Sequence, residues 1–192
     1  MIDFDKIQEE LKKELTRKRY THTLGVAYTA AALAMKYDSD IEMAQTAGLL
    51  HDCAKCYSDT KLLEKANKYG VNITEIEKRN PYLLHGKVGA CVARKKYAVE
   101  EKEILNAISC HTTGMPNMNV LEKIIFLADY IEPNRKMIPR LSTIRKMAFD
   151  NLDYAVYMVL DSTLSYLDQT SEKEIDTVTV EAYEYYKKVF EK

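Results

Sequence analysis

Apolar residues recur along the chain at the three- and four-residue spacing of amphipathic helices. Two clear examples are the set Phe4, Ile7, Leu11 and Leu15 and the set Leu24, Tyr28, Ala31 and Met35. The strict alternation of apolar and polar residues that indicates β-strands is absent. The pattern therefore predicts an all-α protein. The predicted helices lie near residues 3–17, 20–37, 40–54, 60–69, 83–97, 101–110, 120–131, 141–168 (broken near Asp150) and 176–190.

Short signals mark several ends of these helices. Three residue pairs have the spacing of a capping box, in which two side chains bond the free N–H groups of a helix start: Ser39 with Glu42, Thr74 with Glu77, and Asn119 with Glu122. Gly70 is a natural helix stop, and the four prolines fall between the predicted helices. No linker, repeat or low-complexity segment divides the 192 residues, so the sequence predicts a single domain over residues 1–192.

The charge balance of the chain argues against several kinds of partner. The sequence has 28 Lys and Arg residues and 29 Asp and Glu residues, for a net charge of −1. This balance favours neither a nucleic-acid coat nor a basic membrane-binding surface, so any anionic ligand must be held by a local site. The first ten residues lack the pattern of a secretory signal, and no apolar run approaches the roughly 20 residues of a membrane span. We therefore expect a soluble, cytoplasmic protein.

Cys53 and Cys56 form one CxxC pair, a spacing that occurs in zinc sites and redox sites. The other two cysteines, Cys91 and Cys110, are isolated, and no strand–helix pattern of the thioredoxin kind surrounds the pair. The interpretation we favour is four reduced thiols.

All four histidines stand beside small or apolar residues, in RYTHTLG, GLLHDCAK, YLLHGKVGA and ISCHTTG. One such histidine is more often a hydrogen-bonded core residue than a metal ligand, but four of them with embedded aspartates favour a metal site. Asp129 is the clearest of these aspartates, because IIFLADYI places it one helical turn after Ile125 on an apolar face. We expect Asp129 to be buried and to meet a cation, either a metal or, as the alternative, a buried lysine or arginine.

His51 and Asp52 follow the apolar run AGLL, where a helix is expected to end. Adjacent side chains on a helix point in different directions. His51 and Asp52 can therefore reach one centre only if the helix frays at this point or if the centre holds two metals. Imidazole and carboxylate ligands suit Fe, Mn, Co, Zn or Mg, and the ligand types alone select none of them.

The six candidate ligands are His22, His51, Asp52, His85, His111 and Asp129. Their order resembles the H…HD…D signature of the HD-domain metal-dependent phosphohydrolases, an all-helical superfamily, with the two further histidines of its two-metal members. The resemblance implies an HD-domain helical bundle, whose motifs span about residues 17–150, with a C-terminal helical extension at 151–192.

More narrowly, four motifs resemble those of the YqeK branch, the bacterial symmetrical dinucleoside-tetraphosphate hydrolases: HDCAK, LLHGKVGA, CHTTG and FLADYIEPNR. The resemblance implies hydrolysis of diadenosine tetraphosphate to two ADP at two divalent metal ions, with iron the first choice and Mn, Co, Zn or Mg as alternatives. The implied ligands of one metal are His22, His51, Asp52 and Asp129. Those of the second metal are His85, His111 and a bridging Asp52.

Basic and polar residues near these motifs are candidates for binding the phosphates of a nucleotide. Lys55 follows the HD pair by one helical turn, and Arg135 lies in the EPNR turn, so these two are the main candidates. Lys87 and Thr112 are weaker ones. Asp52 and Lys55 are the residues expected to act in catalysis. The expected partner is a small nucleotide, with no nucleic acid and no membrane, and the sequence leaves a homodimer open.

Other functions stay open at this point. A nucleoside monophosphatase of HD type is the main alternative, followed by a nucleotide-binding sensor that keeps the fold without turnover. Guanosine tetraphosphate hydrolases resemble HDxxED where this chain reads HDCAKC, and cyclic dinucleotide phosphodiesterases carry a GYP motif that this chain lacks. A metal-free helical interaction module would give no reason for the order of the four histidines.

Overall fold

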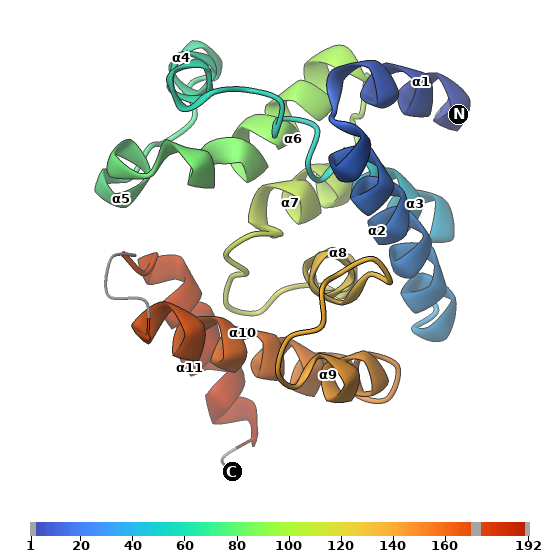
Figure 1. Ribbon diagram of the computed structural model, residues 1–192, viewed down its shortest axis with the longest axis vertical. Coiled ribbons are helices and arrows are strands. Elements are labelled where there is room, and N and C mark those ends of the chain that lie inside the picture. The colour runs from blue at the N-terminus through green and yellow to red at the C-terminus, as the bar shows by residue number, and fades with distance from the viewer. Residues whose placement is uncertain (1–2, 170–173, 191–192) are drawn as a thin grey trace.

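The protein is described by a computed structural model that places residues 3–169 and 174–190 (Figure 1). The helices of this part are α1 (Phe4–Glu14), α2 (Arg17–Lys36), α3 (Ile41–Leu50), α4 (Asp59–Tyr69), α5 (Glu75–Arg79), the 3-10 helix η1 (Pro81–Leu84), α6 (His85–Lys96), α7 (Lys102–Cys110), α8 (Val120–Ile131), α9 (Leu141–Ala148), α10 (Leu152–Asp168) and α11 (Thr177–Phe190). These residues contain no β-strand, so the predicted all-α fold is confirmed. Within the same residues, no helix has the length and apolar character needed to span a membrane.

Helix α8 lies in the middle of the bundle, between α2 on one side and α10 on the other (Figure 1). It also contacts α3, α7 and α9. Its buried apolar residues cover almost every side of the helix and are Leu121, Ile124, Ile125, Phe126, Leu127, Ala128 and Ile131. The predicted capping box of Asn119 and Glu122 is confirmed at its start. Because α8 is enclosed by its neighbours, Asp129 near its C-terminal end is held in a fixed position.

Helices α2 and α3 approach each other closely, and Gly48 makes this approach possible. A Cβ on Gly48 would lie only 2.7 Å from the Cα of Ala27, closer than packed side chains allow. Ala27 is itself buried. The close crossing brings His22, on α2, next to His51, which directly follows α3.

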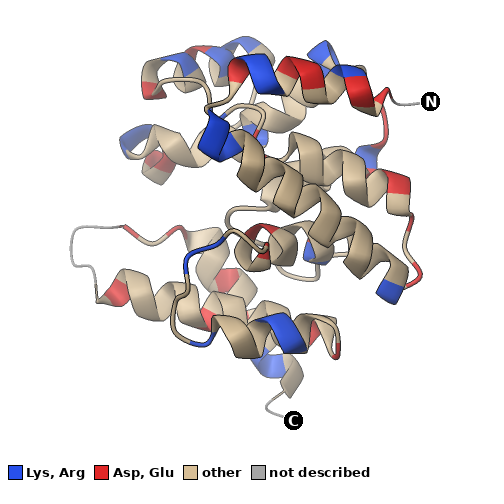
Figure 2. Cartoon of the chain, turned by 45° about the vertical axis from the view of Figure 1, so that its right-hand side comes forward, with Lys and Arg blue, Asp and Glu red and all other residues tan. Residues whose placement is uncertain are grey.

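Charged residues of both signs alternate along the helices at the outside of the bundle (Figure 2). This distribution agrees with the balanced composition of the sequence. Helix α2 differs, because it has no Lys, Arg, Asp or Glu between Arg19 and Lys36. All four cysteines lie within the described residues and are free thiols, as predicted. Burial raises the pKa of the Cys53 thiol, which disfavours redox chemistry at the CxxC pair.

Several predicted helix ends are confirmed. The break near Asp150 separates α9 from α10. Gly70 ends α4 with a left-handed backbone (φ 67°), a conformation that glycine adopts without strain. Thr74 and Glu77 form the predicted capping box, which here starts α5.

Other predictions of local structure are wrong. The start of α3 is capped by Asp40, whose Oδ1 accepts a hydrogen bond from Met43 N at 2.9 Å, and Ser39 plays no such part. Helix α3 stops at Leu50 instead of continuing to 54, and residues 51–56 form a turn. His51 is the C-cap of α3 and keeps helical backbone angles (φ −53°, ψ −39°), and Asp52 follows it in this turn.

Candidate metal centre

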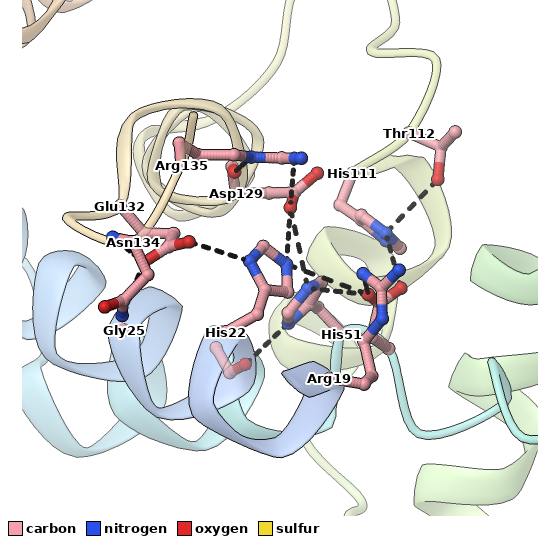
Figure 3. Close-up of polar contacts among 12 residues, drawn as sticks. Arg19, His22, Gly25, His51, His111, Thr112, Asp129, Glu132, Asn134 and Arg135 are labelled. Atoms are coloured by element: carbon pink, nitrogen blue, oxygen red, sulfur yellow. Dashed lines mark hydrogen bonds and ion pairs between the residues drawn. The ribbon is translucent and has the colours of Figure 1, made fainter. Parts of the chain in front are cut away.

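Four histidines and two aspartates from distant parts of the chain meet at one site, most of which Figure 3 shows. They comprise His22 on α2, His51 and Asp52 in the turn after α3, His85 at the first position of α6, His111 after α7, and Asp129 on α8. Neighbouring imidazole rings have their centroids 5.0 or 5.4 Å apart. The structure thus brings together all six residues that the sequence singled out.

Three of the imidazoles are oriented by the backbone. In each, Nδ1 donates to the carbonyl three residues earlier: His51 to Gly48 at 2.7 Å, His85 to Tyr82 at 2.6 Å, and His111 to Ile108 at 2.7 Å. A neutral imidazole that donates through Nδ1 has a lone pair on Nε2. The three Nε2 atoms therefore face the site as acceptors, which is the arrangement that metal-binding histidines need.

The fourth imidazole, that of His22, is oriented by a carboxylate. Its Nδ1 lies 3.1 Å from Oε1 of Glu132, a residue that is only 1% exposed. The other oxygen of Glu132 accepts hydrogen bonds from the backbone N and the Nδ2 of Asn134, at 2.7 and 3.1 Å (Figure 3). A Cβ on Gly25 would overlap this oxygen, so the carboxylate fits only because residue 25 is glycine.

Asp52 stands between two pairs of histidines and is 2% exposed. Its Oδ2 lies 3.8 Å from Nε2 of His22 and 3.4 Å from Nε2 of His51. Its Oδ1 lies 3.4 Å from Nε2 of His85 and 3.7 Å from Nε2 of His111. Each carboxylate oxygen thus faces its own pair of imidazoles.

Several buried acceptor atoms at this site have no donor to bond. Nε2 of His51 and Oδ1 of Asp52 have no hydrogen-bond partner among the described residues, and Nε2 of His22 has a carboxylate oxygen of Asp129 beside it, which is itself an acceptor. The Nε2 atoms of His85 and His111 face each other at 3.2 Å. Facing lone pairs repel unless a cation or a proton lies between them, so this donor set fits divalent metals. The ligand atoms of His22, His51 and Asp129 all lie within 4.8 Å of one another, as do those of His51, Asp52 and His111.

Comparison with known families agrees with this geometry. Residues 19–134, more than half of the chain, match the HD domain family. The chain belongs to the HD domain family.

Relatives of this HD-domain protein match over most of their length. "Bis(5'-nucleosyl)-tetraphosphatase, symmetrical" of Halalkalibacterium halodurans is 40% identical over 157 residues, which are 82% of this chain and 83% of the relative. The protein of the same name from Staphylococcus aureus is 35% identical over 187 residues, 96% of this chain and 95% of the relative. The crystal structure of a "predicted HD superfamily hydrolase involved in NAD metabolism" from Clostridium acetobutylicum is 41% identical, with a TM-score of 0.94 over 98% of this chain and 99% of that one.

The charges of this HD site favour binding of a cation. Burial opposes ionisation of Asp52, but His51 and His111 outweigh it and hold the pKa of its carboxyl well below the usual value. Burial also disfavours charge on His22 and His111, yet the aspartates outweigh it and raise the pKa of both imidazoles. Burial and the neighbouring His111 lower the pKa of His85 to about 3, so His85 is neutral at pH 7.

The expectation that Asp129 is buried is wrong in degree, because 22% of its side chain is exposed. Its Oδ1 lies 2.9 Å from Nε2 of His22 and accepts a hydrogen bond of 2.9 Å from Arg135. On the other side of the site, Arg19 donates to Oδ2 of Asp52 at 2.6 Å. Asp129 therefore has an arginine partner, the alternative that the sequence left open for it, although Arg135 is exposed and not buried. Neither arginine bonds Oδ1 of Asp52 or Nε2 of His51.

Sequence reasoning missed two charged residues of the site, Arg19 and Glu132. Arg19 lies one helical turn before His22, and Glu132 lies three residues after Asp129, so both have the spacing of neighbours on a helix face. That spacing was the available signal. Their partners were not visible in the sequence, because Glu132 bonds a residue 110 positions away.

The four residues proposed to contact phosphates have different surroundings in the structure. Thr112 lies at the cluster, with Oγ1 3.0 Å from Nε2 of His85, and Arg135 is bound to Asp129. Lys55 makes no ion pair or hydrogen bond within the described residues, and burial lowers the pKa of its ammonium. The ammonium of Lys87 is instead held by Glu77, at 2.7 Å from Oε1, which gives that lysine a structural role.

Proposed function

We propose that this protein is a metal-dependent symmetrical dinucleoside-tetraphosphate hydrolase, which splits diadenosine tetraphosphate into two ADP. The observation that carries the proposal is the position of Asp52, with one oxygen toward His22 and His51 and the other toward His85 and His111. A shared carboxylate between two sets of imidazole donors suits a two-metal hydrolase. The substrate is proposed from the two relatives named symmetrical bis(5'-nucleosyl)-tetraphosphatase, which align with more than four fifths of this chain.

Two divalent metal ions, when bound, would lower the pKa of a water molecule and neutralise negative charge on the phosphate oxygens. In the proposed assignment, the ligands of one ion are His22, His51, Asp129 and Oδ2 of Asp52. The ligands of the other ion are His85, His111 and Oδ1 of Asp52. Glu132 would act through His22 by fixing the direction of its ring.

The protein residues around the metals would hold the phosphates in line for attack. Lys55 is a cation without a direct partner, so its ammonium is free to bind a phosphate oxygen. Arg135 lies at the exposed side of the site beside Asp129. A nucleoside diphosphate is a good leaving group, so holding the spread negative charge matters more than a dedicated general acid.

The metal, the oligomer and the compartment remain predictions within this proposal. Iron stays the first choice because the resemblance to the YqeK branch implies it, and the mixed imidazole and carboxylate ligands also suit Mn, Co, Zn or Mg. A homodimer and a cytoplasmic location are likewise compatible with the described residues and are not required by them.

The alternative functions are less well supported. A metal-free interaction module does not explain why the orphaned buried atoms gather between four histidines. A nucleoside monophosphatase of HD type would use the same ligands, but the relatives described above carry the name of a tetraphosphatase. A non-catalytic sensor differs only in turnover, which the next experiment measures.

The first prediction is that metal-loaded protein converts diadenosine tetraphosphate into ADP as the only early product. Water must then attack one of the two inner phosphates, so a reaction in heavy-oxygen water places the label in one of the two ADP molecules. Chromatography and mass spectrometry of an early time course measure both. Early AMP and ATP would contradict symmetrical cleavage, and dephosphorylation of nucleoside monophosphates alone would favour the monophosphatase.

The second prediction concerns Lys55. Lys55→Ala should keep both metals but lower kcat/KM by roughly 10- to 100-fold, because a hydrogen bond from a charged group contributes about 1.5–3 kcal/mol. Lys61→Ala is the matched control, since Lys61 is exposed on α4 and paired with Glu64. It should leave kcat/KM unchanged. Equal rates for the two variants would remove Lys55 from the phosphate site.

A further inference from the structure

A large cavity lies beside Tyr130, the residue that follows the candidate ligand Asp129. Its volume is about 620 Å³, within the range of small-molecule sites. Its walls are Tyr130 at the end of α8, the loop Ile138–Arg140, and the part of α10 from Ser162 to Gln169. A smaller cavity shares Tyr130 and Thr163 with it. The smaller cavity is also lined by His111, Thr112 and Asp129, so Tyr130 and Thr163 stand between the large cavity and the candidate ligands.

The charges are divided between the two ends of this space. At the metal end stand the histidines, Asp129 and the cations proposed to bind phosphates. Among the residues that line the large cavity, Arg140 is the charged one, and its guanidinium is paired with Asp161 at 2.5 Å. The large cavity therefore suits an uncharged part of a ligand whose charged part lies at the metals.

The walls of the large cavity also suit a flat, polar ring. Tyr130, Tyr166, Ile138 and Pro139 provide aromatic and apolar surface, and an aromatic face stacks on any nucleobase. Hydroxyl groups stand beside this surface on α10. Among them, the buried Oγ of Ser162 stands beside the hydroxyl of Tyr130, which also lines the cavity. Hydroxyl groups at an apolar wall are groups with which a ligand can form hydrogen bonds.

We propose that this cavity binds one nucleoside of the substrate, with the base stacked on Tyr166 and the phosphates leading through the smaller cavity to the metal centre. The proposal rests on the proposed function for the position of the phosphates. It adds residues that recognise the base and ribose, and Tyr166 and the hydroxyl groups of α10 among them lie outside the metal-binding motifs.

The test compares the binding of ADP and of inorganic pyrophosphate to the metal-loaded full chain by calorimetry. Tyr166→Ala should raise the Kd of ADP about tenfold, within the range that stacking on an aromatic ring contributes, and leave the Kd of pyrophosphate unchanged. Tyr166→Phe keeps the ring and should bind ADP as the wild type does. The Tyr166 residue is 58% exposed, so its replacement removes no residue of the hydrophobic core.

Tyr28→Ala is the matched control. Tyr28 is 60% exposed and lines a separate groove of about 500 Å³, together with Phe149 and Arg145. It should bind ADP as the wild type does. The proposal is overturned if Tyr166→Ala binds ADP normally, if it weakens ADP and pyrophosphate equally, or if Tyr28→Ala is the variant that loses ADP.

This experiment needs no turnover, so it separates the two proposals. A protein that fails to split diadenosine tetraphosphate but shows the expected effect of Tyr166→Ala keeps its nucleoside site and loses the proposed function. A protein that splits the substrate while Tyr166→Ala binds ADP normally keeps the function and loses the nucleoside site.

Discussion

Replacing Asp52 with alanine is expected to remove both metals and to lower turnover of diadenosine tetraphosphate by more than about 100-fold. The two oxygens of Asp52 lie 3.4 to 3.8 Å from the Nε2 atoms of four histidines. Its loss would deprive both metals of a ligand at once, so the effect should exceed the roughly 10- to 100-fold that loss of an outer partner costs. Elemental analysis and initial rates of the purified variant measure the two effects.

Two further variants separate the charge of Asp52 from its packing. Asp52→Asn keeps the shape of the side chain, so it should fold as the wild type does and still lose the metals. Asp153→Asn removes an exposed carboxylate that pairs with Lys123, and it should keep both metals and full turnover. Normal metal content and rate in Asp52→Ala would show that Asp52 does not bridge the metals.

The all-α fold could be predicted because a buried helix face must repeat every three or four residues, and the chain keeps this repeat throughout. Short elements escape this reasoning. Helix α5 has five residues and η1 has four, which is too short to show a period. The cap of α3 was misplaced by one position, because Ser39 and Asp40 are both good caps and only the backbone geometry decides between them.

The metal cluster could be predicted as a set of residue types in order, but its outer partners could not. Four histidines among apolar neighbours pointed to one site before any geometry was known. Arg19 stands in the run Arg17–Lys18–Arg19, which looks like an ordinary charged helix start. Glu132 could not be paired with His22 from spacing alone, because only the packing of α8 against α2 brings the two side chains together.

Gly25→Ala is expected to weaken metal binding, although Gly25 is not a candidate ligand. Gly25 packs against Glu132, the residue that bonds His22. A Cβ on Gly25 would overlap Oε2 of Glu132 and lie 3.1 Å from its Cδ. Glu132 is buried, so its carboxylate would have to move away from Nδ1 of His22. Loss of such an outer partner costs about 10- to 100-fold in metal affinity, and overpacking costs roughly 1–3 kcal/mol of stability. Metal titration and thermal unfolding measure the two effects.

Gly89→Ala is the matched control, because Gly89 is also inside a helix and buried. A Cβ there would meet its nearest atom, Cγ2 of Ile108, at 3.4 Å, which is ordinary contact. Alanine is better than glycine in a helix by about 0.5–1 kcal/mol, so this variant should be at least as stable as the wild type and keep its metals.

A double substitution distinguishes the steric effect of Gly25→Ala from the loss of the carboxylate. In a Glu132→Ala background the overlapping oxygen is gone, so adding Gly25→Ala should cost little further stability. Metal affinity should stay low in both proteins, because Nδ1 of His22 has lost its acceptor and the ring is no longer held in one direction. If Gly25→Ala binds metal as tightly as the wild type, Glu132 does not orient His22, and its burial beside Asn134 has only a structural role.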